Sequence, residues 1–336
     1  MSMKQDVLDV LSGKTVEKTP VLSATTCGIV DTMDYAKTNY PDAHKDSNEM
    51  ARLGSALHDL TGLECVRVPF CLTVEAEAMG CEIDFGNNDK SAGVASTPYR
   101  SSEDITVPDD IAELGRIPTV LKALQLLKDE YPEVPVIAGA VGPFTLAGHL
   151  IGVENILRKI LTDYLDVEAT IDIAIEVLEQ YLTAINEVNP DIICFADPNS
   201  SPELLSPFDY KFISKPALQE ISEVVKPKSI LHICGRTKPI IPDMLESGFD
   251  GISIEEKCPM DEAQAIKREM NSNVAIVGNI STSKTLFYSP IEDVKKECTE
   301  ALQAGTDILA PSCGIAMRSP TKNIQAMVDA RNEFYE

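Results

Sequence analysis

The residues best suited to chemistry are a histidine and a cysteine two positions apart, in the stretch Leu231-His232-Ile233-Cys234-Gly235. The apolar run here predicts a β-strand over Ser229–Ile233, and residues two apart on a strand point to the same side. His232 and Cys234 can therefore reach one metal ion, since imidazole nitrogen and thiolate sulfur are ligands that zinc prefers. Gly235 allows the chain to turn sharply into the next helix.

A second cysteine follows the last strand that the sequence predicts, Asp307–Ala310, in the stretch Ala310-Pro311-Ser312-Cys313-Gly314. If the strands form a barrel, their carboxyl ends open on one face, where active sites gather. Cys313 could then meet His232 and Cys234. One histidine and two cysteines leave the fourth position of a zinc ion open, which distinguishes catalytic from structural zinc.

A carboxylate lies at the end of the neighbouring predicted strand, Gly251–Glu255. Ser253 and Glu255 share one face of this strand, and Glu256 takes the other. The Glu255 carboxylate could occupy the fourth position on the metal until substrate displaces it, or it could support one of the ligands.

The remaining cysteines and histidines have plainer interpretations. Cys258 is the one rival metal ligand, and His149 is a residue that could line the pocket. Three more cysteines are interpreted as buried structural residues: Cys65, Cys71 and Cys194. His44 and His58 are interpreted as surface or helix residues.

Short apolar runs alternate with amphipathic segments along the chain, which indicates a parallel sheet covered by helices. Eight strands are predicted, so we expect residues 1–336 to form a single (β/α)8 barrel domain with an N-terminal helical extension. The polar segment Cys81–Ile111 reads as an insertion between the second and third strands, with a short β element at Cys81–Phe85. A doubly wound open sheet is the alternative, but no Gly-rich dinucleotide motif follows any strand.

Besides those named above, the predicted strands are Val21–Thr25, Glu64–Pro69, Val134–Ala140, Asp191–Ala196 and Val274–Gly278. The predicted helices are Ser47–Leu60, Val167–Val188, Pro216–Val225, Ile240–Glu246, Asp261–Glu269, Pro290–Ala304 and Thr321–Tyr335.

Composition excludes several classes of function. With 29 Lys and Arg against 53 Asp and Glu, the formal charge is 29 − 53 = −24. No cationic stripe is present, so no nucleic-acid partner is expected. No stretch of 18 apolar residues suggests a membrane span. The odd number of cysteines, nine, is typical of a reducing cytoplasm in which thiols are filler, ligands or nucleophiles.

At these motifs the chain resembles the uroporphyrinogen decarboxylase superfamily. The resemblance covers essentially the whole chain: the Gly13 and Pro20 spacing, Ala140-Val141-Gly142-Pro143-Phe144, Asp197-Pro198, and the run of the last four strands. Within the superfamily, His232-x-Cys234 with Cys313 resembles the methylcobamide:coenzyme M methyltransferases of methanogens. The resemblance implies a (β/α)8 barrel in which these three residues bind zinc, and it suggests Glu255 as the displaceable fourth ligand. It also implies a partner, a small methylated corrinoid protein, and a thiol acceptor, coenzyme M.

Two departures from the other branches of the superfamily favour the resemblance to the methylcobamide:coenzyme M methyltransferases. The decarboxylase branch carries an Arg-rich motif after the first strand, whereas the stretch Leu22–Gly28 contains no arginine. The branch that methylates tetrahydrofolate lacks the zinc triad. Two alternatives remain: another thiol acceptor, or a non-catalytic zinc-stabilised subunit of a methyltransfer complex. For the sulfonate of coenzyme M, position alone suggests Arg318 and Arg236, with Ser312 and Asn279 as further hydrogen-bond donors.

Overall fold

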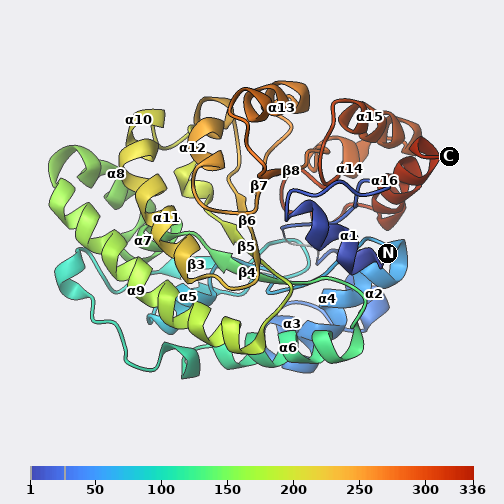
Figure 1. Ribbon diagram of the computed structural model, residues 1–336. Helices are drawn as coiled ribbons and strands as arrows, with labels where there is room; N and C mark the ends of the chain where they lie inside the picture. Colours follow the sequence, from blue (N-terminus) through green and yellow to red (C-terminus); the bar gives the residue numbers. More distant parts are fainter. Residues whose placement is uncertain (1, 26–27) are drawn as a thin grey trace.

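The computed structural model describes residues 2–25 and 28–336, and its centre is a parallel sheet (Figure 1). The strands lie in the order β1 (Val66–Val68), β4 (Val136–Val141), β5 (Ile192–Ala196), β6 (Lys228–His232), β7 (Gly251–Ser253) and β8 (Ala275–Val277). Every residue of β4 and β5 is buried. This burial is expected of parallel strands that carry helices on the outside and other strands across the barrel.

Two further segments close the sheet into a barrel. Ile308 forms a parallel bridge with Val277 of β8, and Leu309 forms one with Val21. On its other side Val21 accepts a hydrogen bond at its carbonyl from the Glu64 amide, at 2.7 Å, just before β1. The (β/α)8 prediction is therefore confirmed, and the open doubly wound sheet is wrong.

The two closing segments are less regular than predicted. Val21–Thr25 and Asp307–Ala310 form isolated bridges instead of full strands, so the predicted strand lengths are wrong there. The amide of Val21 donates to the side chain of Glu64, Oε2, at 2.8 Å. On the side of Val21 that faces β1, this carboxylate takes the place of the backbone carbonyl that a parallel strand would offer to the Val21 amide.

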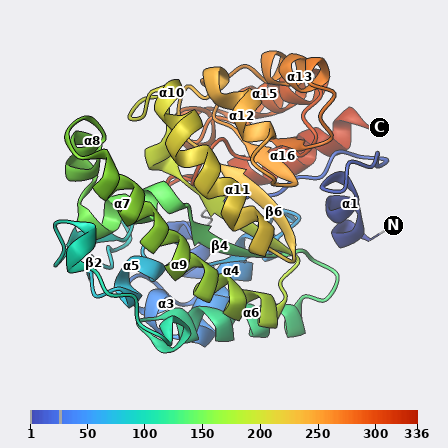
Figure 2. The same cartoon turned by 60° about the vertical axis from the view of Figure 1, so that its left-hand side comes forward.

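Helices surround the barrel, and Figure 2 shows α7, α9 and α11 side by side in front of the sheet. All seven predicted helices are confirmed, with ends that differ by up to three residues. Among the described residues, no helix is both long enough and apolar enough to cross a membrane. The helices are α1 (Met3–Val10), α2 (Val30–Ala36), α3 (Asp42–Lys45), α4 (Ser47–Thr61), α5 (Val74–Ala78), α6 (Ile117–Glu130), α7 (Pro143–Ile151), α8 (Val153–Thr162), α9 (Tyr164–Val188), α10 (Pro207–Asp209), α11 (Lys215–Val224), α12 (Ile241–Leu245), α13 (Met260–Glu269), α14 (Thr285–Tyr288), α15 (Ile291–Gln303) and α16 (Thr321–Phe334).

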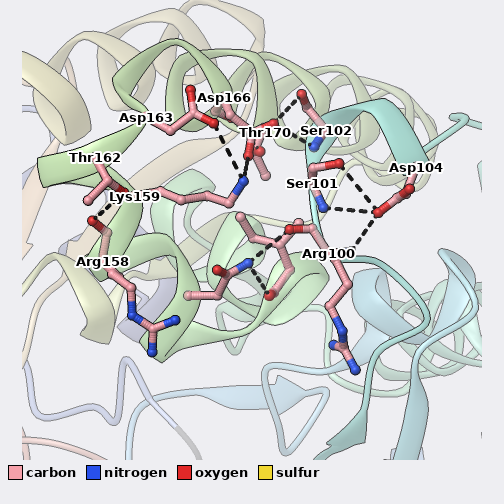
Figure 3. A network of polar contacts seen from close by, with 12 residues as sticks. Arg100, Ser101, Ser102, Asp104, Arg158, Lys159, Thr162, Asp163, Asp166 and Thr170 are labelled. Atoms are coloured by element: carbon pink, nitrogen blue, oxygen red, sulfur yellow. Dashed lines mark hydrogen bonds and ion pairs between the residues drawn. The ribbon is translucent and has the colours of Figure 1, made fainter.

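The predicted extension and insertion are both present. Helix α1 precedes the first barrel segment, and the insertion contains a hairpin of β2 (Glu82–Asp84) and β3 (Gly93–Ser96). Beyond the hairpin, the insertion is fastened to α8 and α9 (Figure 3). The amide and hydroxyl of Ser102 donate to Asp166 Oδ1 at 2.8 and 2.6 Å, and Lys159 donates to Asp166 Oδ2 at 2.5 Å.

We expect Asp166→Ala to release the insertion, because one carboxylate accepts all three of these hydrogen bonds. The free energy of unfolding should fall by about 1–3 kcal/mol, and amide hydrogen exchange should accelerate over residues 98–105. The exposed pair of Arg158 and Glu154 on α8 supplies the control: Glu154→Gln should change stability by less than about 0.5 kcal/mol. Equal effects of Asp166→Ala and Glu154→Gln would show that the contacts of Asp166 do not hold the insertion in place.

The same contact has a defined pH dependence. Burial works to raise the pKa of Asp166, but the hydrogen bonds from Lys159 and Ser102 outweigh it and leave that pKa below its ordinary value. A depressed folded-state pKa means that the stabilisation is present above the unfolded-state pKa. It should be lost as the pH falls through the folded-state value, and exchange in wild type should then approach that of Asp166→Ala.

Candidate metal centre

Three soft donor atoms meet at the carboxyl ends of the barrel strands. His232 is the last residue of β6, Cys234 follows two positions later, and Cys313 comes after the eighth barrel segment. The Nε2 atom of His232 lies 3.2 Å from Cys234 Sγ, and the two sulfurs lie 3.5 Å apart. His232 is buried and both cysteines are partly buried. The three residues that sequence reasoning selected thus come together in space.

The spacing of these atoms fits one metal ion. The three ligand atoms all lie within 4.8 Å of one another, and no other His, Cys, Asp or Glu group among the described residues meets this criterion for three or more ligands. In a tetrahedral zinc site, ordinary bond lengths would separate two sulfurs by about 3.8 Å and a nitrogen from a sulfur by about 3.5 Å. The observed distances differ from these by only a few tenths of an ångström. The group therefore fits zinc in both donor type and geometry.

The two thiols oppose each other's ionisation. The hydrogen bond between them raises the pKa of Cys234, and burial adds to the increase. The same hydrogen bond lowers the pKa of Cys313, helped by the nearby His232. The loss of a proton from one thiol therefore disfavours its loss from the other. A divalent metal removes this conflict, because it binds both sulfurs as thiolates.

A serine on the neighbouring strand orients the histidine. Ser253 on β7 is the register partner of His232, and its Oγ lies 3.0 Å from His232 Nδ1. Ser253 is fully buried. A contact at Nδ1 leaves Nε2 directed at the sulfurs, which is the usual arrangement around a metal-binding histidine. Sequence reasoning located Ser253 on the strand but gave it no role. Its position at the end of the strand next to the one that carries His232 could have indicated this role.

A crowded glycine turn follows Cys234. Gly235 has φ +85°, and a Cβ atom there would lie 2.6 Å from Ser201 Oγ. No other residue type fits both the backbone angle and the space. The amide of Gly235 donates to Glu255 Oε2 at 2.8 Å. The Glu255 carboxylate thus lies beside the turn, outside the group of three ligand atoms.

The other polar residues selected from the sequence lie around the mouth. Arg236 is exposed in the turn. The exposed Arg318 donates from Nε to Asp89 of the insertion at 2.6 Å. Ser312 is buried, and its Oγ accepts from the Thr282 amide at 3.4 Å. Asn279 Nδ2 donates to the carbonyl oxygen of Cys258 at 2.8 Å.

The remaining cysteines that the structure describes are all buried. Cys258 is fully buried, its sulfur is 3.9 Å from its neighbour's carbonyl oxygen, and burial raises its pKa to about 11. Those interpreted as filler, Cys65, Cys71 and Cys194, are all buried, which confirms that interpretation. Thr26 and Cys27, which belong to the arginine-free stretch Leu22–Gly28, lie outside the described residues.

His44 and His58, predicted to be surface or helix residues, both lie on helices, and His44 is not on the surface. It is fully buried and stacks on Tyr40 with ring centroids 4.3 Å apart. Burial, with a contribution from Arg116, lowers its pKa to about 3, so it packs as a neutral aromatic ring. His58 lies on α4 and contacts the Leu63 carbonyl oxygen. His149 lines a cavity of about 350 Å³ beside β3, away from the three ligand residues.

Comparison with known proteins identifies the family. The model of the uroporphyrinogen decarboxylase (URO-D) family matches residues 2–334. A methylcobamide:CoM methyltransferase of Methanosarcina barkeri is 41% identical, over 99% of this chain and 98% of the relative. A second methylcobamide:CoM methyltransferase, from Methanosarcina mazei, is 32% identical over 98% of each chain.

A solved structure agrees with these relatives. A methyltransferase from Methanosarcina mazei has a TM-score of 0.97 and 40% sequence identity, with 100% of each chain covered. Agreement of this extent leaves no part of the barrel unmatched, and it confirms the resemblance inferred from the motifs. The chain belongs to the uroporphyrinogen decarboxylase family, and within it to the branch of enzymes that are methyltransferases.

Proposed function

We propose that this enzyme transfers a methyl group from a methylated corrinoid protein to the thiol of coenzyme M, in the cytoplasm, as one barrel domain with a zinc ion bound by His232, Cys234 and Cys313. The convergence of the three donor atoms at the barrel mouth carries the proposal. The relatives named as methylcobamide:CoM methyltransferases support the choice of donor and acceptor.

The chemistry follows from what this donor set does to a thiol. Zinc held there would keep the acceptor thiol deprotonated at neutral pH, since a coordinated thiol loses its proton outright. The thiolate sulfur then bonds to the methyl carbon, the carbon–cobalt bond breaks, and both its electrons remain on cobalt as Co(I). Two cysteine thiolates and a neutral imidazole offset the charge of a divalent ion, so the acceptor sulfur retains the electron density it needs to attack.

The residues around the triad have supporting roles in this proposal. Ser253 holds the imidazole of His232 in one orientation. Glu255 is proposed as the displaceable fourth ligand, because the amide next to Cys234 holds its carboxylate beside the three donor residues. Arg236 and Arg318 are both exposed at the mouth, where the sulfonate of coenzyme M would enter.

Zinc-edge X-ray absorption with and without coenzyme M tests the proposal most directly. We expect one nitrogen or oxygen scatterer to be replaced by a third sulfur when the thiol is added, because the open position is where the acceptor binds. If the set of atoms bound to zinc does not change, the acceptor is another molecule or the zinc is structural. A structural zinc corresponds to the non-catalytic alternative.

Substitution of the ligands gives a second test. Cys313→Ser, Cys234→Ser and His232→Ala should each lower zinc content, measured by plasma mass spectrometry, and reduce methyl transfer from methylcobalamin by several orders of magnitude. Cys258→Ser is the matched control, because this thiol is buried nearby but its sulfur lies outside the ligand group. Zinc loss in the Cys258 variant would overturn the choice of ligands.

Ser253 can be tested separately from the ligands. Ser253→Ala should weaken zinc binding about 10–100-fold, measured by competition with a chelator, because the imidazole loses its partner at Nδ1. Ser253→Thr retains the hydroxyl and should restore most of the affinity. If both variants bind zinc like wild type, Ser253 contributes packing alone.

A further inference from the structure

A lysine next to the metal centre has no role in the proposal so far. Lys257 lies in the turn after β7, and its Nζ is 3.4 Å from Glu255 Oε2. That same oxygen accepts the Gly235 amide at 2.8 Å, directly after Cys234. A short series of contacts therefore links the Lys257 ammonium to one of the three ligand residues.

A second carboxylate holds Lys257 from the opposite side. Glu203 Oε1 is 3.1 Å from Lys257 Nζ, and a Cβ atom on Gly235 would lie 3.1 Å from Glu203 Cδ. Both carboxylates that bind the ammonium thus border the same glycine. This arrangement fixes the charged end of a long side chain beside the metal centre, although that side chain is still 43% exposed.

The ammonium retains capacity for another partner. Three carboxylate oxygens lie near the ammonium: Glu203 Oε1 at 3.1 Å, and Glu203 Oε2 and Glu255 Oε2 at 3.4 Å each. The two contacts at 3.4 Å are long for hydrogen bonds, so a ligand at the barrel mouth can compete for these N–H groups through the exposed part of the side chain. An anion bound there would lie beside a cation near the metal centre, in a protein whose net charge of −24 otherwise repels anions.

Other cations near the mouth are less well placed. Arg318 is bound to Asp89 in the insertion, and Lys238 is bound to Glu262 at 2.7 Å. Neither partner carboxylate touches Gly235 or a ligand residue. Arg236 follows Gly235 directly and is exposed, so it is the main rival for an anionic group.

We propose that Lys257 binds the anionic tail of the thiol substrate and sets the preference for a thiol with a negative group two carbons from its sulfur. The inference rests on the proposed function, because the thiol must bind with its sulfur at the three ligand residues. Glu203 holds the ammonium in place before the thiol arrives, so little side-chain entropy is lost on binding. The tail contact is made equally before and during methyl transfer, so it affects binding more than turnover.

Three thiols of equal length separate the tail from the sulfur: 2-mercaptoethanesulfonate, 2-mercaptoethanol and 2-aminoethanethiol. We would measure their affinity for the zinc-loaded protein by calorimetry, and kcat and KM with methylcobalamin. Lys257→Met should weaken the sulfonate thiol by about 10-fold or more, the scale of one hydrogen bond between charged groups. It should leave 2-mercaptoethanol unchanged and kcat nearly constant. Lys257→Glu should reverse the order, with 2-aminoethanethiol preferred.

Controls separate the tail site from general damage. Lys238→Met removes an exposed, ion-paired lysine from the turn after β6 and should change nothing. Zinc content should equal that of wild type in every variant. The proposal is overturned if Lys257→Met weakens all three thiols alike, weakens none, or if Arg236→Met carries the selective loss. Methyl transfer to none of the thiols by wild type would contradict the proposed function, whereas the calorimetric order of the thiols still decides the role of Lys257.

Discussion

The contact between two sulfur atoms that lie 79 positions apart in the chain is the one on which the rest of the site depends. One sulfur follows β6, and the other follows the segment that closes the barrel onto Val21. A register slip of one residue in that segment would move Cys313 by about 3.3 Å and turn its side chain to the other face. The closing bridges, though short, therefore determine whether a metal can be bound at all.

Charge is the second constraint, and it acts around Gly235. Two thiols and the carboxylates of Glu203 and Glu255 surround this turn in a chain that is already strongly acidic. Such a concentration of potential anions is stable only with cations among them. Lys257 offsets the carboxylates, and a divalent metal would offset the thiolates. In the proposed function, the local acidity would favour metal binding, and Lys257 would still allow an anionic substrate to approach.

The motifs were sufficient to predict the barrel, the helices and the three converging donors, because each depends on local pattern and on the rule that parallel strands end on one face. The roles of Ser253 and Lys257 depend on contacts between neighbouring loops and strands that no local pattern encodes. The polar neighbours of His44 in the sequence allow a surface position as well as a helical one, whereas the structure places it on α3, buried and stacked on Tyr40. The irregularity of the first closing segment could not be predicted, because there the Glu64 side chain takes the place of a backbone partner of Val21.

The identity of the residue behind His232 completes the electrostatic argument. Metal-binding histidines often contact a carboxylate, which adds negative charge to the site. Here the partner is the neutral hydroxyl of Ser253, fully buried within the barrel, where an unpaired charge would be costly. With a neutral partner, the charge of the three proposed ligands would stay at minus two and would balance a divalent ion. In the proposed reaction, the thiolate of the acceptor would then carry the only excess charge, which would keep it nucleophilic toward a methyl group. A carboxylate behind the histidine would instead add negative charge to the site before the acceptor arrived and oppose the binding of that thiolate.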